Sequence, residues 1–323
     1  MTRHFLVDTD LTPDEQASVL DLAASLKADR FSRRPLAGPQ TVGVVFDKTS
    51  TRTRVSFATG VSDLGGSPLI INPGETQLGH KESIADSARV FSRMLAAVVW
   101  RTYEQAGLEE MAEHSTVPVV NGLSDDYHPC QILADLLTLR EHFGDLAGRT
   151  LAYVGDAANN MANSYLLGCA TAGMHVRVAG PEGYLPREDV VAAARERAGA
   201  TGGSVLVTTD AREALAGADA VVTDTWVSMG QESEKAERTE IFAAYSVTAE
   251  AMALAAQDAV FLHCLPAYRG LEVAAEVIDG PASLVWDEAE NRLHAQKALL
   301  TFLLDSSGLS ADLPAALRRE GTR

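Results

Sequence analysis

The fold expected for this chain is set by one stretch, Val42-Gly43-Val44-Val45-Phe46-Asp47-Lys48-Thr49-Ser50-Thr51-Arg52-Thr53-Arg54. An apolar run precedes a short polar loop, and the amphipathic segment 55–64 follows, so the predicted order is strand, loop, helix. Hydroxyls and an arginine stand where the helix begins, and the N–H groups of a first helical turn have no partners within the helix. The pattern predicts a phosphate site. A capped helix with solvated arginines stays open as the alternative.

The loop is not the usual nucleotide-triphosphate loop, because it has no Gly-x-x-x-x-Gly-Lys pattern. The chain has 323 residues, which suggests about two domains. Its 27 Lys and Arg stand against 44 Asp and Glu, a net charge of −17. Such a surface repels nucleic acid and anionic membranes, so neither is expected as a partner. Any phosphate site must therefore be a local cationic pocket.

The start of the sequence has no signal-peptide pattern, and no run of about 18 apolar residues suggests a membrane span. The three cysteines, Cys130, Cys169 and Cys264, are too few for a disulfide framework, and no Cys/His spacing resembles a zinc site. A cytoplasmic location is expected, because a reducing compartment fits this cysteine usage.

Apolar strand candidates alternate with helix candidates in two series. The first series is 41–46, 68–72, 96–100 and 117–120, and the second is 151–154, 175–179, 204–207, 220–223, 259–262 and 284–286. This alternation predicts an α/β fold with two doubly wound parallel-sheet domains, joined by helices. A capping box from Thr12 to Glu15, with Pro13 at the first position, begins the first helix.

The domain boundary is expected near residue 148, giving domains 1–147 and 148–287. The segment 129–143 is predicted to be a single helix linking the domains, and a last helix is predicted at about 287–304. The polar stretch 227–240 follows a strand end, where open α/β sheets bind ligands. We interpret it as a mobile lid that excludes water, with an ordinary surface loop as the alternative.

Three further segments change the interpretation of the phosphate loop. They are His128-Pro129-Cys130-Gln131, then Asp224 with Ser228-Met229-Gly230, then His263-Cys264-Leu265-Pro266. With Ser50–Arg54 and in this order, they resemble the motifs of the carbamoyltransferases, over about residues 11–304. Asp224 and the Ser-Met-Gly loop are similar to the ornithine branch, since the aspartate branch shares the first two motifs but not this loop.

The resemblance implies transfer of the carbamoyl group of carbamoyl phosphate to the δ-amine of L-ornithine, giving L-citrulline and phosphate in arginine biosynthesis. It also implies a homo-oligomer based on trimers, with no metal and no organic cofactor. The C-terminal helix, about 288–323, is then expected to pack back on the first domain.

For carbamoyl phosphate, the resemblance implies contacts from both domains. The implied set is Ser50, Thr51, Arg52, Thr53, Gln77 from a neighbouring subunit, Arg101, His128, Gln131, Cys264, the carbonyl of Leu265, and Arg292. His128 and Gln131 donate to the carbamoyl group, which is oxyanion-hole chemistry.

For ornithine, the resemblance implies Asn160, Asp224, Ser228 and the backbone of Met229. Asp224 pairs with the α-ammonium. The catalytic set is Arg101, His128, Gln131, Asp224 and Cys264. A Cys beside a His invites a nucleophilic interpretation, but carbamoyl phosphate is already activated, so we expect no covalent intermediate on Cys264.

Three alternatives remain at this point. The acceptor could be another amine, such as putrescine, aspartate or an acylated ornithine, although aspartate would need cations for its second carboxylate. A dinucleotide-binding oxidoreductase could share the sheet, but the turn 151–160 has one glycine, Gly155, where that fingerprint needs three. A non-catalytic regulatory homologue is disfavoured by the intact Ser50–Arg54, Arg101 and His128.

Overall fold

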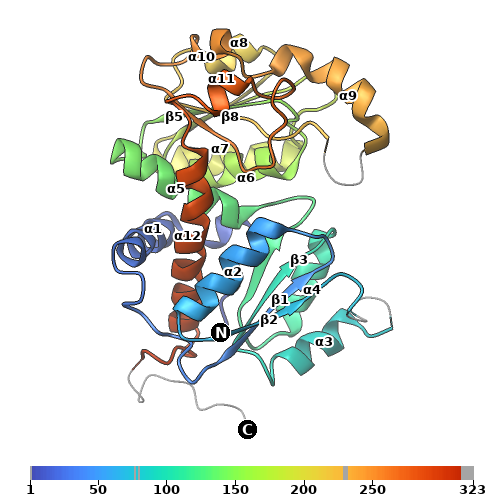
Figure 1. Cartoon of the computed structure of the whole chain (residues 1–323), viewed down its shortest axis with the longest axis vertical. Coiled ribbons are helices and arrows are strands. Elements are labelled where there is room, and N and C mark those ends of the chain that lie inside the picture. Colours follow the sequence, from blue (N-terminus) through green and yellow to red (C-terminus); the bar gives the residue numbers. More distant parts are fainter. Residues whose placement is uncertain (1, 76–77, 79–80, 228–231, 314–323) are drawn as a thin grey trace. The chain divides into compact units, whose positions relative to one another are not determined.

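The computed structural model describes residues 2–75, 78, 81–227 and 232–313 (Figure 1). The chain divides into two compact units. The first consists of Met1–Ala134 with Asn291–Arg323, and the second is Asp135–Glu290. Both are α/β, so the predicted fold class is confirmed.

The first unit is built on four parallel strands in the order β2-β1-β3-β4. They are β1 Thr41–Phe46, β2 Ser67–Ile71, β3 Ala97–Arg101 and β4 Val119–Leu123. The helices are η1 Asp8–Asp10, α1 Pro13–Ala28, α2 Thr51–Asp63, α3 Ile84–Phe91 and α4 Gln105–His114. Helix α5, Pro129–Phe143, begins in this unit and ends in the second.

Helices cover the sheet of the first unit on both faces, which explains why β1 is a continuous apolar run. Helices α3 and α4 lie side by side (Figure 1) over a core that includes Val45, Val98 and Trp100. On the other side, Lys297 of the last helix reaches Asp63 at the end of α2 (3.3 Å). The capping box predicted for α1 is confirmed, since Thr12 accepts from the N–H of Glu15.

The second unit has five parallel strands in the order β7-β6-β5-β8-β9. They are β5 Thr150–Val154, β6 His175–Ala179, β7 Ser204–Thr208, β8 Ala220–Val222 and β9 Val260–Leu262. The helices are α6 Asn160–Thr171, α7 Glu188–Thr201, α8 Ala211–Leu215, η2 Glu232–Glu234, α9 Lys235–Phe242, η3 Ala243–Tyr245, α10 Ala249–Met252 and α11 Ala275–Ile278. Helix α12, Val285–Ser306, begins here and continues into the first unit.

Each sheet has one place where the strand order reverses. In the first unit the chain goes from β1 outward to β2 and then returns to β3 on the other side of β1. In the second unit it goes from β5 outward to β7 and then returns to β8 beside β5. Open α/β sheets bind ligands at the carboxyl ends of the strands at such a point. The segments after β1, β3, β5 and β8 are therefore where the fold places chemistry.

One predicted strand was wrong. Helix α12 begins at Val285, and beside β9 Ser283 forms an isolated bridge with Phe261, whose carbonyl accepts from the N–H of Leu284 (2.9 Å). Asp287 and Glu288 stand in the first helical turn, where acidic side chains favour a helix N-terminus. The apolar triplet is thus a helix start whose Val285 is buried and whose Trp286 is exposed.

The domain limits 1–147 and 148–287 stay a prediction. The two compact units divide between Ala134 and Asp135, inside α5, and again between Glu290 and Asn291, inside α12. A helix that belongs to both units leaves no single residue as the boundary.

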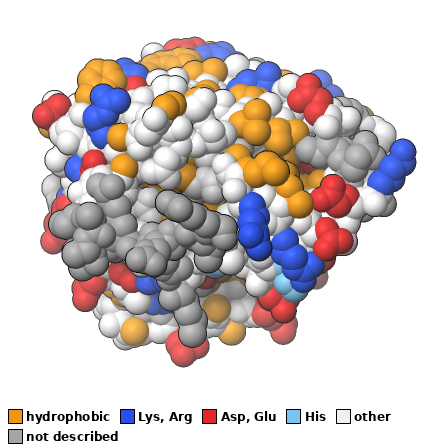
Figure 2. Space-filling model, turned by 90° about the horizontal axis from the view of Figure 1, so that it is seen from below, with side chains coloured by type: hydrophobic (Ala, Val, Ile, Leu, Met, Phe, Trp, Pro, Cys, Tyr) orange, Lys and Arg blue, Asp and Glu red, His pale blue; other side chains and the backbone are white. Residues whose placement is uncertain are grey.

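No helix among the described residues combines the length and the apolar character needed to cross a membrane. Figure 2 shows one face of the molecule, where apolar side chains gather beside Lys and Arg side chains. The large apolar side chains exposed in the first unit include Val55, Leu69, Val90 and Met94.

Candidate active site

The phosphate loop predicted after β1 forms the capped N-terminus of α2. Ser50 is the N-cap, and its Oγ accepts from the N–H of Thr53 (3.2 Å) and donates to Thr53 Oγ1 (3.0 Å). The first turn of α2 holds no acidic residue. The positive end of the helix dipole is therefore not neutralised by its own side chains, which suits an anion.

Arginines from three different elements surround this helix start within the first unit. Arg52 lies in α2, Arg101 ends β3, and Arg292 lies in the part of α12 that belongs to this unit. Arg292 donates to Thr53 Oγ1 (2.9 Å), and Arg101 pairs in register with Phe46 at the end of β1. In a chain with this net negative charge, a phosphate site must be a local cationic pocket. These three arginines bring positive charge together in one place.

His128 lies close enough to the same arginines to feel their charge. Burial, and then the charges of Arg292, Arg101 and Arg52, hold the pKa of His128 well below its ordinary value. The imidazole is therefore neutral at neutral pH. A neutral imidazole keeps one N–H group, and this group can donate a hydrogen bond to a carbonyl oxygen.

The helix that follows His128 places the rest of its motif. Gln131 is fully buried one turn into α5, and its N–H donates to the carbonyl of His128 (3.0 Å). Cys130 donates its S–H to the carbonyl of Asn121 (3.3 Å), and burial raises the pKa of its thiol to about 12. The thiol stays protonated, in keeping with a packing role.

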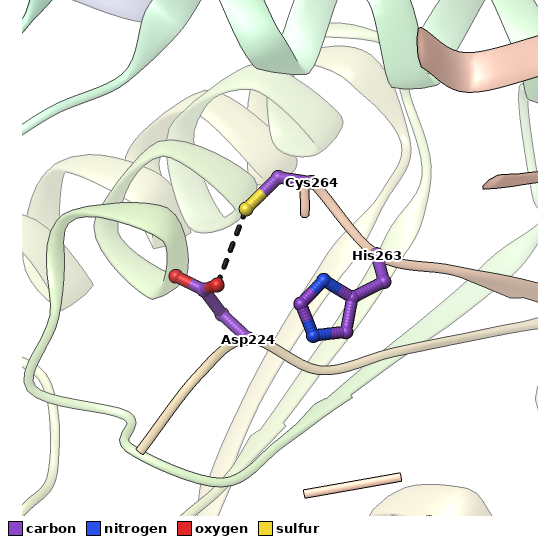
Figure 3. Close-up of side chains that lie close together, drawn as sticks. All are labelled: Asp224, His263 and Cys264. Atoms are coloured by element: carbon purple, nitrogen blue, oxygen red, sulfur yellow. Dashed lines mark hydrogen bonds between the residues drawn. The ribbon is translucent and has the colours of Figure 1, made fainter. Parts of the chain in front are cut away.

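In the second unit, Asp224 and Cys264 meet at the ends of neighbouring strands. Cys264 donates to Asp224 Oδ1 (3.2 Å), and the N–H of Thr225 donates to the same oxygen (2.7 Å), as Figure 3 shows for the first of these bonds. Burial raises the pKa of Asp224 above its ordinary value. Burial and the charge of Asp224 also raise the pKa of Cys264 well above its ordinary value, so the sulfur is a neutral donor rather than a thiolate.

His263 fixes the turn that follows β9. Its Nδ1 accepts from the N–H of Leu265 (2.9 Å), and its Nε2 faces Glu272 Oε1 (3.4 Å). The N–H of Tyr268 donates to the same Glu272 oxygen (2.5 Å). Leu265 has φ 58°, an uncommon conformation for a side-chain-bearing residue, and its bond to His263 holds it there.

Asp224, His263 and Cys264 also offer ligand atoms within 4.8 Å of one another, a donor set that a soft divalent metal accepts. Both ring nitrogens of His263 already face partners, so metal binding would require the ring to leave one of them.

On the other side of the strand reversal, Asn159 caps α6. Its Oδ1 accepts from the N–H of Ala162 (3.0 Å), and its Nδ2 donates to Tyr153 Oη (2.9 Å). Asn160 follows as the first residue of α6 and is half-buried. Three predicted site residues, Gln77, Ser228 and Met229, lie outside the described residues.

Comparison with known proteins places these sites in a family. Residues 3–141 match the description "Aspartate/ornithine carbamoyltransferase, carbamoyl-P binding domain", and residues 147–303 match "Aspartate/ornithine carbamoyltransferase, Asp/Orn binding domain". The chain belongs to the aspartate/ornithine carbamoyltransferase family.

Within this family its relatives are ornithine carbamoyltransferases. One from Renibacterium salmoninarum is 68% identical over 95% of this chain and 100% of the relative. The solved structure from Pyrococcus furiosus is 45% identical, has a TM-score of 0.89 and covers 93% of this chain and 96% of its own. A structure described as the anabolic enzyme of Campylobacter jejuni is 37% identical with a TM-score of 0.88, covering 94% and 99%. The chain is thus one of the ornithine carbamoyltransferases, and an enzyme.

Several charged residues of this carbamoyltransferase chain are buried although the sequence did not mark them. Arg238 lies in the stretch 227–240, interpreted from the sequence as a mobile lid, but the described part of that stretch contains η2 and α9, and Arg238 is buried. Its spacing of four from Phe242, which is also buried, was the signal, because residues i and i+4 share a helix face. Glu272 and Glu288 are buried as well, and no local pattern marks them.

Proposed function

We propose that this chain transfers the carbamoyl group of carbamoyl phosphate to the δ-amine of L-ornithine, releasing phosphate and L-citrulline. The observation that carries the proposal is the neutral, buried His128 within the field of Arg52, Arg101 and Arg292, of which Arg292 also bonds Thr53 in the first turn of α2, a turn without acidic residues. This arrangement suits a substrate with an anionic end and a carbonyl next to it.

In the proposal, each part of carbamoyl phosphate is bound by a matching group of the protein. The phosphate takes the first-turn N–H groups of α2 and the hydroxyls of Ser50, Thr51 and Thr53, and charge-assisted bonds from Arg52 and Arg292. Arg101 contacts both the phosphate and the carbonyl. His128 donates to the carbonyl oxygen and Gln131 binds the amide end, so negative charge developing on that oxygen is stabilised.

The acceptor is bound by the second unit. Asp224 pairs with the α-ammonium and Asn160 orients the amino-acid end, with Ser228 and the backbone of Met229 assisting. Cys264 and the carbonyl of Leu265 lie beside the attacking amine and the carbamoyl nitrogen.

The reaction then needs a proton to leave the acceptor. A primary amine has a pKa near 10, so the δ-ammonium must lose a proton before its lone pair attacks the carbonyl carbon. Asp224, whose pKa burial raises, accepts this proton, and the neutral Cys264 assists by donating its S–H to Asp224 Oδ1. The tetrahedral intermediate collapses as the C–O bond to phosphate breaks.

Assembly and pathway are further parts of the proposal. Exposed apolar side chains of the first unit, such as Val55 on α2 and Leu69 on the edge strand β2, supply surface for a second copy. We propose a trimer in the cytoplasm, with Gln77 reaching the phosphate of a neighbouring subunit. A role in arginine biosynthesis is supported by the described anabolic relative from Campylobacter jejuni.

The deciding experiment compares L-ornithine, putrescine, N-acetylornithine and L-aspartate as acceptors with carbamoyl phosphate, by measuring carbamoylated product and phosphate. We expect L-ornithine to have by far the highest kcat/KM. Arg52→Ala should abolish most turnover in a folded protein, whereas Arg89→Ala, on an exposed position of α3, should not. A preference for putrescine or N-acetylornithine would overturn the acceptor assignment.

A further inference from the structure

Arg238 has an environment that a surface helix does not explain. It lies in α9, where Lys235, Glu237 and Glu240 are also charged, yet only 4% of it is exposed. Its guanidinium pairs with the buried carboxylate of Asp156 and donates from Nε to the carbonyl of Trp226. The rings of Tyr184 and Phe242 lie 5.3 Å and 5.1 Å from its central carbon.

Arg238 also pairs with Glu234, one turn earlier in the chain (3.5 Å). Its other two polar partners belong to different turns. Asp156 follows β5, in the turn that continues to the N-terminus of α6 at Asn160. Trp226 follows β8, two residues after Asp224. Strands β5 and β8 are neighbours at the strand-order reversal of the second sheet. One side chain thus joins the two turns that carry the residues proposed to bind the amino acid.

The turns themselves pack too tightly to move independently. Gly155 has φ 136°, and a Cβ placed on it would lie 3.1 Å from Thr223 Oγ1. Tyr153 donates to the carbonyl of Asp156 (3.1 Å) and accepts from Asn159. A displacement of Asp156 would therefore be passed to the start of α6.

The amino ends of the same two strands, β5 and β8, provide a comparison. There Arg149 pairs with Asp219 (2.9 Å) and lies 4.7 Å from the ring of Phe143, so it also joins the chain at β5 to the chain at β8. That arginine is 40% exposed, and it stands at the amino ends of the strands, where no site is expected. Burying a charged pair costs desolvation free energy, so the buried version at the ligand-binding edge calls for a role beyond stability.

We propose that Arg238 is a positioning residue for the amino-acid substrate, holding the β5–α6 turn and the segment after β8 at a fixed separation. The inference rests on the proposed function. It does not make Arg238 a group that touches the substrate.

Arg238→Lys is the sharpest test, because lysine keeps the charge but presents one compact donor group in place of a planar fork. It cannot satisfy Asp156 and the carbonyl of Trp226 with the same geometry, nor lie flat over two rings. We expect the KM for L-ornithine to rise about tenfold to a hundredfold. The KM for carbamoyl phosphate should change less than about twofold, since the proposed phosphate site belongs to the other unit.

The matched control is Arg149→Lys, which removes the same kind of fork from the same two strands at the other edge. It should leave both KM values unchanged even where it lowers the melting temperature. Asp156→Asn is the second variant. Asparagine keeps the shape of aspartate and one acceptor oxygen of the pair. Asp156→Asn should also raise the KM for L-ornithine, and it serves as the test if Arg238→Lys does not fold.

Unchanged ornithine KM in folded Arg238→Lys, or an equal rise for both substrates, would overturn the proposal. So would an equal rise in ornithine KM for the Arg149→Lys control. The wild-type acceptor comparison is done first, so absence of citrulline formation there would count against the proposed function and not against the role of Arg238.

Discussion

At the scale of a single residue, Asp224 is a carboxylate that is both buried and close to another acidic side chain. Its carboxylate is largely buried, with bonds from Thr225 and Cys264, while the nearby Glu272 adds negative charge. Burial raises its pKa, which means that the folded chain binds a proton there more readily than the unfolded chain does. Under the proposed function, a carboxylate kept in this state for an ammonium ligand lowers the free energy of unfolding when the ligand is absent.

Asp224→Asn should therefore separate activity from stability. Because the folded pKa is raised, the free energy of unfolding of the wild type falls as pH rises from the ordinary carboxyl range to the raised pKa. The variant has no such titration. We expect it to be more stable than the wild type at neutral pH without ligand, with the difference shrinking below about pH 4.

The same variant should raise the KM for L-ornithine strongly and leave that for carbamoyl phosphate nearly unchanged. Thermal unfolding from pH 3 to 8 and initial rates check both halves. A variant less stable than the wild type at neutral pH would contradict the stability half, and equal losses for both substrates would contradict the assignment.

Cys264→Ser tests the neutral-thiol interpretation. The raised pKa of Cys264 and its bond to Asp224 describe a hydrogen-bond donor, and a hydroxyl can replace it. We expect weaker use of L-ornithine but continued turnover. Mass spectrometry of the wild type, quenched during turnover, should show no carbamoyl group on Cys264. Such an adduct, formed and consumed at the rate of turnover, would refute the non-covalent mechanism.

Site residues could be predicted from the sequence where their polar groups are neighbours in the chain. Ser50–Arg54 puts its polar groups at one helix start, so local rules predict an anion site there, whereas the roles predicted for His128 and Gln131 came from the resemblance of their motif to a known family. Asp156 and Arg238 are 82 positions apart, and their pairing depends on the order of the strands. Burial of a charge depends on what covers it, and a charge-rich segment such as α9 gives no local sign of that cover.

Helix α1 shows how a tertiary contact reinforces a local signal at the scale of an element. Glu15 closes the capping box on the N–H of Thr12 (2.9 Å) and also pairs with Arg3 (2.7 Å), which lies before the helix. The bond from Arg3 lowers the pKa of Glu15 to about 2. The sequence predicted the box but could not predict Arg3, because nothing local specifies the path of residues 3–12.

Glu15→Gln should cost about 1 kcal/mol or less of unfolding free energy at neutral pH, since both partners are partly exposed and solvent screens them. The folded pKa is lowered, so the contribution is present above the ordinary carboxyl pKa and is lost as pH falls toward about 2. Urea unfolding at pH 7 and at pH 2 measures the difference. The double variant with Arg3→Gln should add little at pH 7, and strict additivity of the two would refute the coupling.

Strands were predictable where apolar runs are buried on both faces, as in β1 and β5. The triplet at 284–286 has the same local composition but begins a helix. Its acidic successors favour a helix, and on that side of β9 Ser283 forms an isolated bridge with Phe261. Three residues carry too little periodicity to distinguish a strand from a helix turn.

At the scale of the whole molecule, the proposal predicts a trimer whose subunits share active sites. Arg101→Ala should disable the donor site within a subunit, and Gln77→Ala should disable the contribution to a neighbour. Mixing the two inactive proteins under conditions that exchange subunits should restore some citrulline formation, because a mixed trimer contains a site with both native residues. Exchange confirmed by mass without any recovered activity would contradict a shared site.

The first unit is assembled from two separated parts of the chain, and this has a consequence for synthesis on the ribosome. Leu299, Leu300 and Leu303 of α12 are buried, and Lys297 bonds the carbonyl of Arg30, just after α1, and pairs with Asp63 at the end of α2. The second unit, Asp135–Glu290, is continuous and emerges complete before them. At roughly 5–20 residues per second, residues 1–134 wait about 9–34 s for their missing helix, which ends at Ser306. The half made first is therefore finished last, and it is the nascent segment that most needs a chaperone.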